Sequence, residues 1–421
     1  MTPRALSVVH FSTADAIGGS ARSAYRIHEG LRSRGHRSRM LVGYKSSVDP
    51  DVATVSGHPW LQFADRVVDK LTAAVGAQYR WLPSSHRLVR HPWLRDADVI
   101  QLYNTHGGYF SQWLLPRLAA MAPLVWRLSD QWAMTGHCAY SGDCQRWLDG
   151  CGVCPALGAY PPLGRDTTAK LFLRKQELYQ QSPTTIVAPS SWIRDLAARS
   201  PLLGHFPIVQ VPNGLDGKEF FPRDRQAARA TLGLPAEGRV ILFSAHVLDH
   251  NPRKGGELLM AALNRRPPPP DTVLALMGEG GETWIGRVPC EVRLLGFRRD
   301  AEAMATCYAA ADIVAVPSVL ENLPNTLIES LACGRAVVAM DSGGMRDGVR
   351  HGRTGYLASA GSIDDLAAGI CLLLDNEALR LAMEAEARSL FLAEFTRERE
   401  LQRLENLYAS LTVRSGSSET S

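Results

Sequence analysis

The sequence feature that most constrains the fold is a unit in which two apolar runs flank a single short helix. Ile313–Val316 and residues 336–339 are apolar runs of the length of buried strands. Residues 325–333 between them have a helical pattern, and Gly334 provides a stop directly after it. Two buried strands joined through a helix predict a parallel α/β sheet.

The same unit carries groups that suit a ligand. The helix is expected to take Asn325 or Thr326 as its cap. The N–H groups of Asn325, Thr326 and Leu327 then lie at the positive end of the helix dipole and suit a phosphate. Glu321 precedes the helix and Glu329 lies about one turn inside it, where carboxylates can accept hydrogen bonds from sugar hydroxyls. The unit predicts a nucleotide-sugar pocket; a solvent-facing glutamate on an ordinary α/β helix is the alternative.

The rest of the chain alternates strand and helix patterns in the same way, in two halves. A length of 421 residues suits two domains. We therefore expect an α/β protein with two doubly wound, Rossmann-like domains that face a central cleft. The expected parts are a first domain over residues 1–212, a second domain over 213–385, a final helix over 386–412 and a disordered tail over 413–421.

Composition and charge argue against a nucleic-acid-binding, a membrane-spanning or a secreted protein. The net charge of +4 is too mild to argue for nucleic-acid binding. No run of about 18 apolar residues occurs, so no transmembrane helix is expected. The first residues lead directly into a short strand and do not have the pattern of a signal peptide. We therefore expect a cytoplasmic protein.

Glycine-rich and polar turns follow the predicted strands of the first half. Gly18 and Gly19 lie between the first strand and the first helix, where glycine lets backbone N–H groups approach a phosphate. His106 and Asp130 each follow a later strand. Ligands of open α/β sheets bind at the carboxyl ends of the strands, which makes these residues site candidates. For each of them, a turn without a ligand is the alternative.

Basic and glycine-containing turns also follow the strands of the second half. Arg253 and Lys254 lie between a strand and a helix, where two cations can clamp a diphosphate and stabilise a departing nucleotide. A surface turn of the Lys-Gly type is the alternative. Gly278 follows the next strand and belongs to a Gly-x-Gly turn.

A cysteine-rich segment at 137–155 interrupts the first half. Its cysteines are Cys138, Cys144, Cys151 and Cys154, and the last two form a Cys-x-x-Cys pair. Four thiols in 17 residues predict a structural zinc site, with disulfides and free thiols as the alternatives. Three glycines and a proline make the segment irregular, so some interaction must order it.

The stretch 79–95 is basic and aromatic. It holds Trp81, Trp93 and several arginines, and it has no acidic residue. Such a stretch can contact the anionic lipid of a membrane, which would place the protein at the inner face of the cytoplasmic membrane. A solvated basic face with buried tryptophans is the alternative.

The unit described first resembles the donor-site signature of family 4 glycosyltransferases, which reads Ser-x2-Glu-x-x-Pro-x4-Glu-x2-Ala-x-Gly. The matching residues are Ser318, Glu321, Pro324, Glu329, Ala332 and Gly334. The turns Gly-Gly-Tyr-Phe at 107–110 and Asp-x-Trp-x-x-Thr-Gly at 130–136 resemble a subgroup that builds bacterial surface polysaccharides. The resemblance implies a GT-B fold and a retaining transferase that needs no metal for catalysis. It also implies that the final helix packs back on the first, acceptor-side domain.

The resemblance implies donor-site roles for residues of both halves. Glu329 would bind the ribose of the nucleotide, and Glu321 would hold hydroxyls of the transferred sugar. The diphosphate would be bound by the residues Gly18, Gly19, Arg253, Lys254, Asn325, Thr326 and Leu327, with Gly278 passing close to the nucleotide.

The resemblance also points to the reacting centre. In that subgroup a His usually precedes the Asp after the strand, and here Ser129 occupies its place. Asp130 and His106 are therefore the candidates for positioning or proton transfer. The expected activity is transfer of a hexose to a saccharide or a polyprenyl-linked acceptor in surface polysaccharide biosynthesis. A nucleotide-sugar 2-epimerase of the same fold and a non-catalytic sugar-nucleotide-binding protein are the alternatives.

Overall fold

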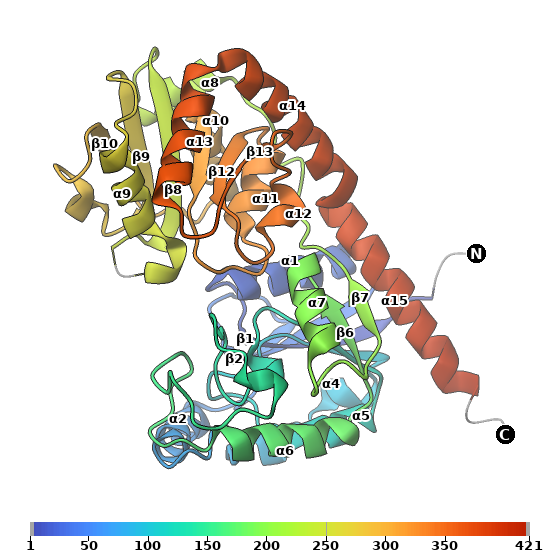
Figure 1. Ribbon diagram of the computed structural model, residues 1–421. Coiled ribbons are helices and arrows are strands. Elements are labelled where there is room, and N and C mark those ends of the chain that lie inside the picture. The colour runs from blue at the N-terminus through green and yellow to red at the C-terminus, as the bar shows by residue number, and fades with distance from the viewer. Residues whose placement is uncertain (1–3, 250, 418–421) are drawn as a thin grey trace. The chain divides into compact units, whose positions relative to one another are not determined.

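The computed structural model describes residues 4–249 and 251–417. Within that range the chain forms two compact units (Figure 1). Unit 1 comprises the residues up to Val211 together with those from Leu401 onward, and unit 2 comprises Pro212–Glu400. The division after Val211 lies next to the domain boundary expected from the sequence. Each unit is described by itself.

Unit 1 is built on a seven-stranded sheet in which all strand pairs are parallel. The strands are β1 (Ser7–Ala14), β2 (Arg37–Tyr44), β3 (Val52–Thr54), β4 (Val99–Leu102), β5 (Leu124–Arg127), β6 (Thr184–Ala188) and β7 (Ile208–Gln210). The helices are α1 (Gly19–Ser33), α2 (Pro59–Ala74), α3 (Ser85–Leu88), α4 (Pro92–Arg95), α5 (Leu114–Ala119), α6 (Thr168–Gln180), α7 (Ser191–Arg199) and α15 (Arg397–Ser417).

Unit 2 repeats this plan with six parallel strands. They are β8 (Arg239–Val247), β9 (Thr272–Glu279), β10 (Glu291–Leu294), β11 (Ile313–Val316), β12 (Ala336–Met340) and β13 (Gly355–Ala358). The helices are α8 (Arg225–Leu232), α9 (Gly256–Arg265), α10 (Ala301–Ala310), α11 (Asn325–Ala332), α12 (Met345–Gly348), α13 (Ile363–Asp375) and α14 (Glu377–Glu394). Strands β11 and β12 are buried along their whole length, which explains why both read as continuous apolar runs.

Each sheet reverses its strand order once. The order is β3-β2-β1-β4-β5-β6-β7 in unit 1 and β10-β9-β8-β11-β12-β13 in unit 2. The reversal therefore lies between β1 and β4 in unit 1, and between β8 and β11 in unit 2. Open α/β sheets bind ligands outside the carboxyl ends of the strands at such reversals, because the crossover helices diverge to opposite faces there.

The last helix belongs to unit 1 through buried contacts. Leu401, Leu404 and Tyr408 of α15 are buried in the same apolar cluster as Val8 of β1. The hydroxyl of Tyr408 donates a hydrogen bond to the side-chain oxygen of Gln101, a polar residue of the buried strand β4. Helix α15 runs to Ser417, so the prediction of disorder from residue 413 is wrong for 413–417, and residues 418–421 lie outside the described residues.

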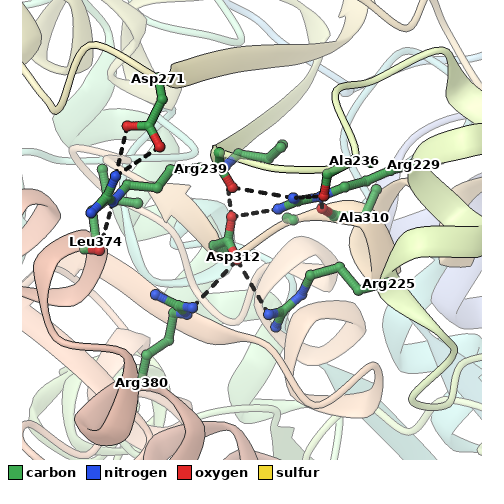
Figure 2. Close-up of polar contacts among 12 residues, drawn as sticks. Arg225, Arg229, Ala236, Arg239, Asp271, Ala310, Asp312, Leu374 and Arg380 are labelled. Atoms are coloured by element: carbon green, nitrogen blue, oxygen red, sulfur yellow. Dashed lines mark hydrogen bonds and ion pairs between the residues drawn. The ribbon is translucent and has the colours of Figure 1, made fainter.

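A buried carboxylate organises unit 2 at the amino end of its sheet (Figure 2). Oδ2 of Asp312, which directly precedes β11, accepts hydrogen bonds from Nη2 of Arg229 at 2.6 Å and from the N–H of Val240 at 2.7 Å. Its Oδ1 lies 3.2 Å from Arg225 and 3.5 Å from Arg380. The carboxylate thus connects β8, β11, α8 and α14, and its removal would take from the buried Arg229 the one anion that it pairs with among the described residues.

We expect Asp312→Ala to lower the free energy of unfolding by about 3–5 kcal/mol, because breaking a buried ion pair leaves uncompensated charge. Urea unfolding followed by circular dichroism measures the change. Asp271 is the matched control, since it pairs with Arg239 at 2.6 Å but its side chain is half exposed. Asp271→Ala should cost less than about 1 kcal/mol. Equal losses in the two variants would contradict this role of Asp312.

Candidate functional site

At the strand-order reversal of unit 2, the predicted cations and the first predicted carboxylate come together. Arg253 and Lys254 follow β8 in a single turn of 3-10 helix, and Glu321 follows β11. Nζ of Lys254 lies 2.9 Å from Oε1 of Glu321, and Nη1 of Arg253 lies 3.7 Å from the same oxygen. Glu321 is only 8% exposed, whereas both cations keep part of their side chains accessible. Glu321 thus holds two cations that remain able to meet an anion.

Backbone hydrogen bonds connect the loops that carry these side chains. The N–H of Val319 donates to the carbonyl of Arg253 at 2.9 Å, and the N–H of Gly344 donates to the carbonyl of Glu321 at 3.0 Å. Gly343 has a φ of 56°, and a Cβ there would lie 1.9 Å from the carbonyl oxygen of Glu321. The loops after β8, β11 and β12 therefore position Glu321 from both sides, and only glycine fits at position 343.

The second predicted carboxylate, Glu329, lies inside the core of unit 2. It is 3% exposed, and its Oε2 accepts a hydrogen bond from the hydroxyl of Tyr308 at 2.7 Å. Burial and then the charge of Glu329 raise the pKa of Tyr308 well above its ordinary value, so this phenol remains a donor. Tyr308 lies in α10 and was missed from the sequence, where it reads as one apolar residue of a buried helix.

The start of α11 differs in detail from the expectation. Pro324 is the N-cap, so Asn325 and Thr326 are the first helical residues, and both are partly exposed. The N–H of Leu327 donates to the carbonyl of Pro324 at 3.1 Å. Proline favours this place because its fixed φ suits the entry to a helix. The predicted phosphate donors Asn325 and Thr326 lie at the helix front, while Leu327 is buried and its N–H is already used.

Gly278 is the other glycine predicted for the donor side. It lies within β9 rather than in the turn after it, and its N–H donates to the carbonyl of Gly296 at 3.1 Å. A Cβ at Gly278 would lie 1.9 Å from the carbonyl oxygen of Ala245 in β8. This glycine therefore permits the close approach of two neighbouring strands.

In unit 1, His106 and Asp130 meet as a buried pair. Nε2 of His106 lies 2.8 Å from Oδ2 of Asp130, and Oδ1 of Asp130 accepts from the N–H of Trp132 at 2.9 Å. The side-chain amide of Asn104 donates to Oδ2 of Asp130 at 2.8 Å. Within the part of the chain that the structure describes, Nδ1 of His106 is buried without a hydrogen-bond partner. The pair thus fixes the ring by one nitrogen and leaves the other nitrogen for a further group.

The turn after β1 completes this group of residues. Gly18 has a φ of 89° and is the N-cap of α1, and Gly19 is the first helical residue; both are exposed. The hydroxyl of Ser20 donates to Oδ1 of Asn104 at 2.6 Å and lies 2.7 Å from the hydroxyl of Ser129. Ser20 therefore joins the start of α1 to the ends of β4 and β5, and its partner Ser129 stands where the resembling subgroup has His. Asn104 and Ser20 were not singled out from the sequence.

The four cysteines of the segment 137–155 line one small cavity of about 20 Å³. Among the described residues, no group of three or more His, Cys, Asp or Glu side chains is placed to hold a metal ion. The arrangement therefore does not fit the predicted zinc site. Cys138, Cys144, Cys151 and Cys154 are free thiols, and burial raises the pKa of Cys138 to about 11.

Hydrogen bonds to the residues before α6 and to its first turn hold this segment: the N–H of Cys154 donates to the carboxylate of Asp166 at 2.6 Å, and the N–H of Gly152 donates to the hydroxyl of Thr168 at 3.0 Å. A buried lysine holds the turn just before the segment. Nζ of Lys175 in α6 donates to the carbonyls of Trp132 and Thr135 at 2.5 and 2.9 Å, and it lies 3.5 Å from the centroid of the Trp132 ring. His137 contributes a contact of 3.3 Å between its Nε2 and Sγ of Cys154. Hydrogen bonds to neighbouring residues of unit 1 thus contribute the ordering for which the sequence predicted zinc.

Comparisons with known proteins agree with this geometry. Residues 238–376 match the model of the family described as "Glycosyl transferases group 1". A putative colanic acid biosynthesis glycosyl transferase of Escherichia coli K12 is 24% identical over 358 residues, which cover 81% of this chain and 85% of that protein. A D-inositol 3-phosphate glycosyltransferase of Rhodococcus opacus is 32% identical over 194 residues, 43% of each chain.

Solved structures support the fold. Sucrose-phosphate synthase from Thermosynechococcus elongatus superposes with a TM-score of 0.68 and 19% identity, over 97% of this chain and 100% of that one. Anabaena HepE, solved in complex with UDP-glucose, superposes with a TM-score of 0.67 and 18% identity, over 96% and 100%. The two doubly wound units therefore form a GT-B fold. The named relatives do not support a 2-epimerase or a non-catalytic binding protein.

The buried lysine makes stability depend on pH. Burial lowers the pKa of Lys175 from 10.5 to about 7, so between pH 7 and 10.5 the unfolded chain binds more protons at this site than the folded chain. The free energy of unfolding should therefore rise with pH in this window, by at most about 1.4 kcal/mol per unit. We expect the difference in free energy of unfolding between the native chain and Lys175→Met to change with pH by this amount. Urea unfolding at several pH values measures it.

Lys170 is the control, because it is an exposed lysine of the same helix. The difference in free energy of unfolding between the native chain and Lys170→Met should not vary with pH. A pH-independent difference for Lys175→Met would contradict a lowered pKa.

Proposed function

We propose that the chain, which is similar to family 4 glycosyltransferases, transfers a hexose from a nucleoside-diphosphate sugar to a saccharide or lipid-linked acceptor with retention of configuration. The observation that carries the proposal is the placement of Arg253, Lys254 and Glu321 at the strand-order reversal of unit 2, where an α/β sheet binds its ligand. We assign the donor site to this group together with the front of α11.

In the proposed donor site, cations bind the diphosphate of the nucleotide sugar and carboxylates bind its hydroxyl groups. Arg253 and Lys254 would bind the diphosphate and stabilise the negative charge that develops on it as the glycosidic bond breaks. Lys254 approaches Oε1 of Glu321, which leaves Oε2 to accept hydrogen bonds from hydroxyls of the sugar. Glu329, oriented by Tyr308, would accept hydrogen bonds from the ribose.

The proposed transfer proceeds through a transition state with oxocarbenium character. The bond between the anomeric carbon and the phosphate oxygen breaks, and the acceptor hydroxyl adds to the same face of the sugar. Its proton passes to the departing phosphate. The chain's contribution is to position the donor and to neutralise the leaving group, which are effects of placement and electrostatics rather than of a covalent intermediate.

The proposed acceptor side belongs to unit 1. Nδ1 of His106 can accept a hydrogen bond from an acceptor hydroxyl, since Nε2 carries the proton and donates a hydrogen bond to Asp130. The ring of Tyr160 is 59% exposed and lies 5.5 Å from the His106 ring, where it would offer an apolar face to a sugar. The ring of Trp132, 5.6 Å from His106, is buried and supports the imidazole. The resemblance to the colanic acid enzyme supports an acceptor in surface polysaccharide biosynthesis.

We expect Glu329→Gln and Lys254→Ala to lower the rate of transfer by at least about a hundredfold, because each removes a charged contact to the donor. Transfer from a radiolabelled nucleotide sugar to a membrane extract measures the rate. Glu257→Gln and Lys218→Ala change exposed residues of the same types and should retain activity. Unchanged turnover in Glu329→Gln or Lys254→Ala, with folding intact, would refute the donor assignment.

We expect His106→Ala and Asp130→Asn to slow transfer to the acceptor while the affinity for the nucleotide is retained. Both residues belong to the proposed acceptor side, so hydrolysis of the donor in the absence of acceptor should change little. Isothermal titration with a nucleoside diphosphate reports the affinity. A parallel loss of nucleotide binding would contradict the division of roles.

A further inference from the structure

Helix α2 of unit 1 presents a continuous row of large apolar side chains to solvent. Trp60, Phe63, Val67, Leu71 and Val75 are 64%, 68%, 40%, 64% and 64% exposed. Their spacing of three or four residues places them along one face of the helix and into its C-cap. We call these five side chains the α2 stripe. Exposed apolar residues are common singly, but a continuous row of this kind marks an interaction surface.

The opposite face of α2 attaches the helix to unit 1. Leu61 and Asp65 are its buried residues, and Oδ1 of Asp65 accepts a hydrogen bond from the N–H of Ser84 at 3.0 Å. The carboxylate of Asp69 lies against Gly108, where a Cβ would come within 2.5 Å of it. Figure 1 shows α2, in blue, at the periphery of unit 1. The helix is thus held by one side, and the α2 stripe is on the other.

The charges around the α2 stripe have one sign. Asp65 and Asp69 are the acidic residues of the range 58–95, and both turn toward unit 1. Burial, and then repulsion by Asp65, raise the pKa of Asp69 to about 6. The exposed cations in this range are Arg66, Lys70, Arg80, Arg87, Arg90 and Arg95. Apolar side chains bordered by cations, with no exposed carboxylate in 58–95, complement an anionic lipid surface.

Tryptophan and arginine extend this surface beyond the end of α2. Trp81 is 55% exposed, and the guanidinium of Arg80 lies 4.5 Å from the centroid of its ring. Trp93, by contrast, is half-buried, and the guanidinium carbon of Arg39 lies 5.1 Å from the centroid of its ring. The stretch 79–95 that the sequence singled out therefore supplies the border, and the apolar part of the surface lies on α2.

We propose that the α2 stripe is a membrane-binding surface, by which α2 lies in the interface of an anionic bilayer. Among the described residues, no helix has the length and apolarity needed to cross a bilayer. The inferred attachment is peripheral: the apolar face enters the boundary between headgroups and acyl chains, and the cations meet lipid phosphates. This inference does not depend on the proposed chemistry of transfer.

The position of α2 also relates the surface to the proposed acceptor side. Through Asp69, the inner face of α2 contacts Gly108, two residues after His106. A bilayer at the outer face of α2 is therefore separated from the His106 loop by the thickness of one helix, about 10 Å. This part of the inference rests on the proposed function, and it favours an acceptor carried on a membrane lipid.

Flotation of the full chain with vesicles tests the proposal. Wild type should float with vesicles of phosphatidylcholine and phosphatidylglycerol, and less with vesicles of phosphatidylcholine alone. The double variant Phe63→Glu, Leu71→Glu should lower the partition coefficient by tenfold or more, roughly the effect of withdrawing two large apolar side chains from a bilayer. Arg66→Gln with Lys70→Gln should lower it by roughly fivefold per residue at low salt only.

Leu173→Glu is the matched control. Leu173 lies on α6 of the same unit and is 57% exposed, close to the value for Leu71, but it is outside the α2 stripe. This variant should float as wild type does. Thermal melting of all variants checks that folding is intact, since every substituted residue is exposed.

Three outcomes would overturn the proposal. The first is failure of wild type to float with the anionic vesicles, and the second is loss of binding by Leu173→Glu as complete as that of the double variant. The third is a dimer seen in sedimentation, without any vesicle binding, that the double variant dissociates; it would assign the α2 stripe to a second copy of the chain. Transfer to a water-soluble acceptor analogue should be retained by the double variant, which separates failure of this proposal from failure of the proposed function.

Discussion

The order of the strands in the two parallel sheets is the constraint on which the proposed sites depend. In each unit the order reverses beside the first strand, so two adjacent strands send their loops apart and leave a place for a ligand at their carboxyl ends. In unit 2 these loops carry Lys254 and Glu321, and in unit 1 they carry Ser20 and His106. Residues that are remote in the chain meet there because all the strands of a sheet run in one direction.

Buried charge is used in two ways in unit 2. At the amino end of the sheet, Asp312 is surrounded by arginines that hold α8 and α14 to the strands, and this network has a structural role. At the carboxyl end, Glu321 faces cations that are still partly exposed. A buried carboxylate with partly exposed cations can exchange partners with an incoming anion, which an enclosed ion pair cannot do without a large loss of free energy.

Helix α2 connects two kinds of surface in unit 1. Its inner face carries Asp65 and Asp69 against the unit, and its outer face carries the α2 stripe. Helical periodicity separates the two sets of side chains by half a turn, so one short element can border the His106 loop and also present apolar residues to a bilayer. The acidic residues of α2 thus face inward while its cations Arg66 and Lys70 stay exposed, and the burial that raises the pKa of Asp69 is one consequence.

The sequence by itself determined the alternation of strands and helices, the unit around Glu321 and Glu329, and the turns that carry Gly18, Lys254 and His106. These are local patterns, and local periodicity and turn chemistry are legible in a single chain. Only the tertiary structure decided that Tyr308 orients Glu329, that Asn104 and Ser20 support Asp130, and that Asp166 and Thr168 bind the backbone of the cysteine segment. Each of these contacts joins residues far apart in sequence, and a side chain's partner depends on how the sheet is assembled. The same reason applies to the zinc prediction: spacing counts thiols along the chain, whereas coordination requires their sulfur atoms within bonding distance of one point. The four thiols line one cavity, but among the described residues they do not form such a group.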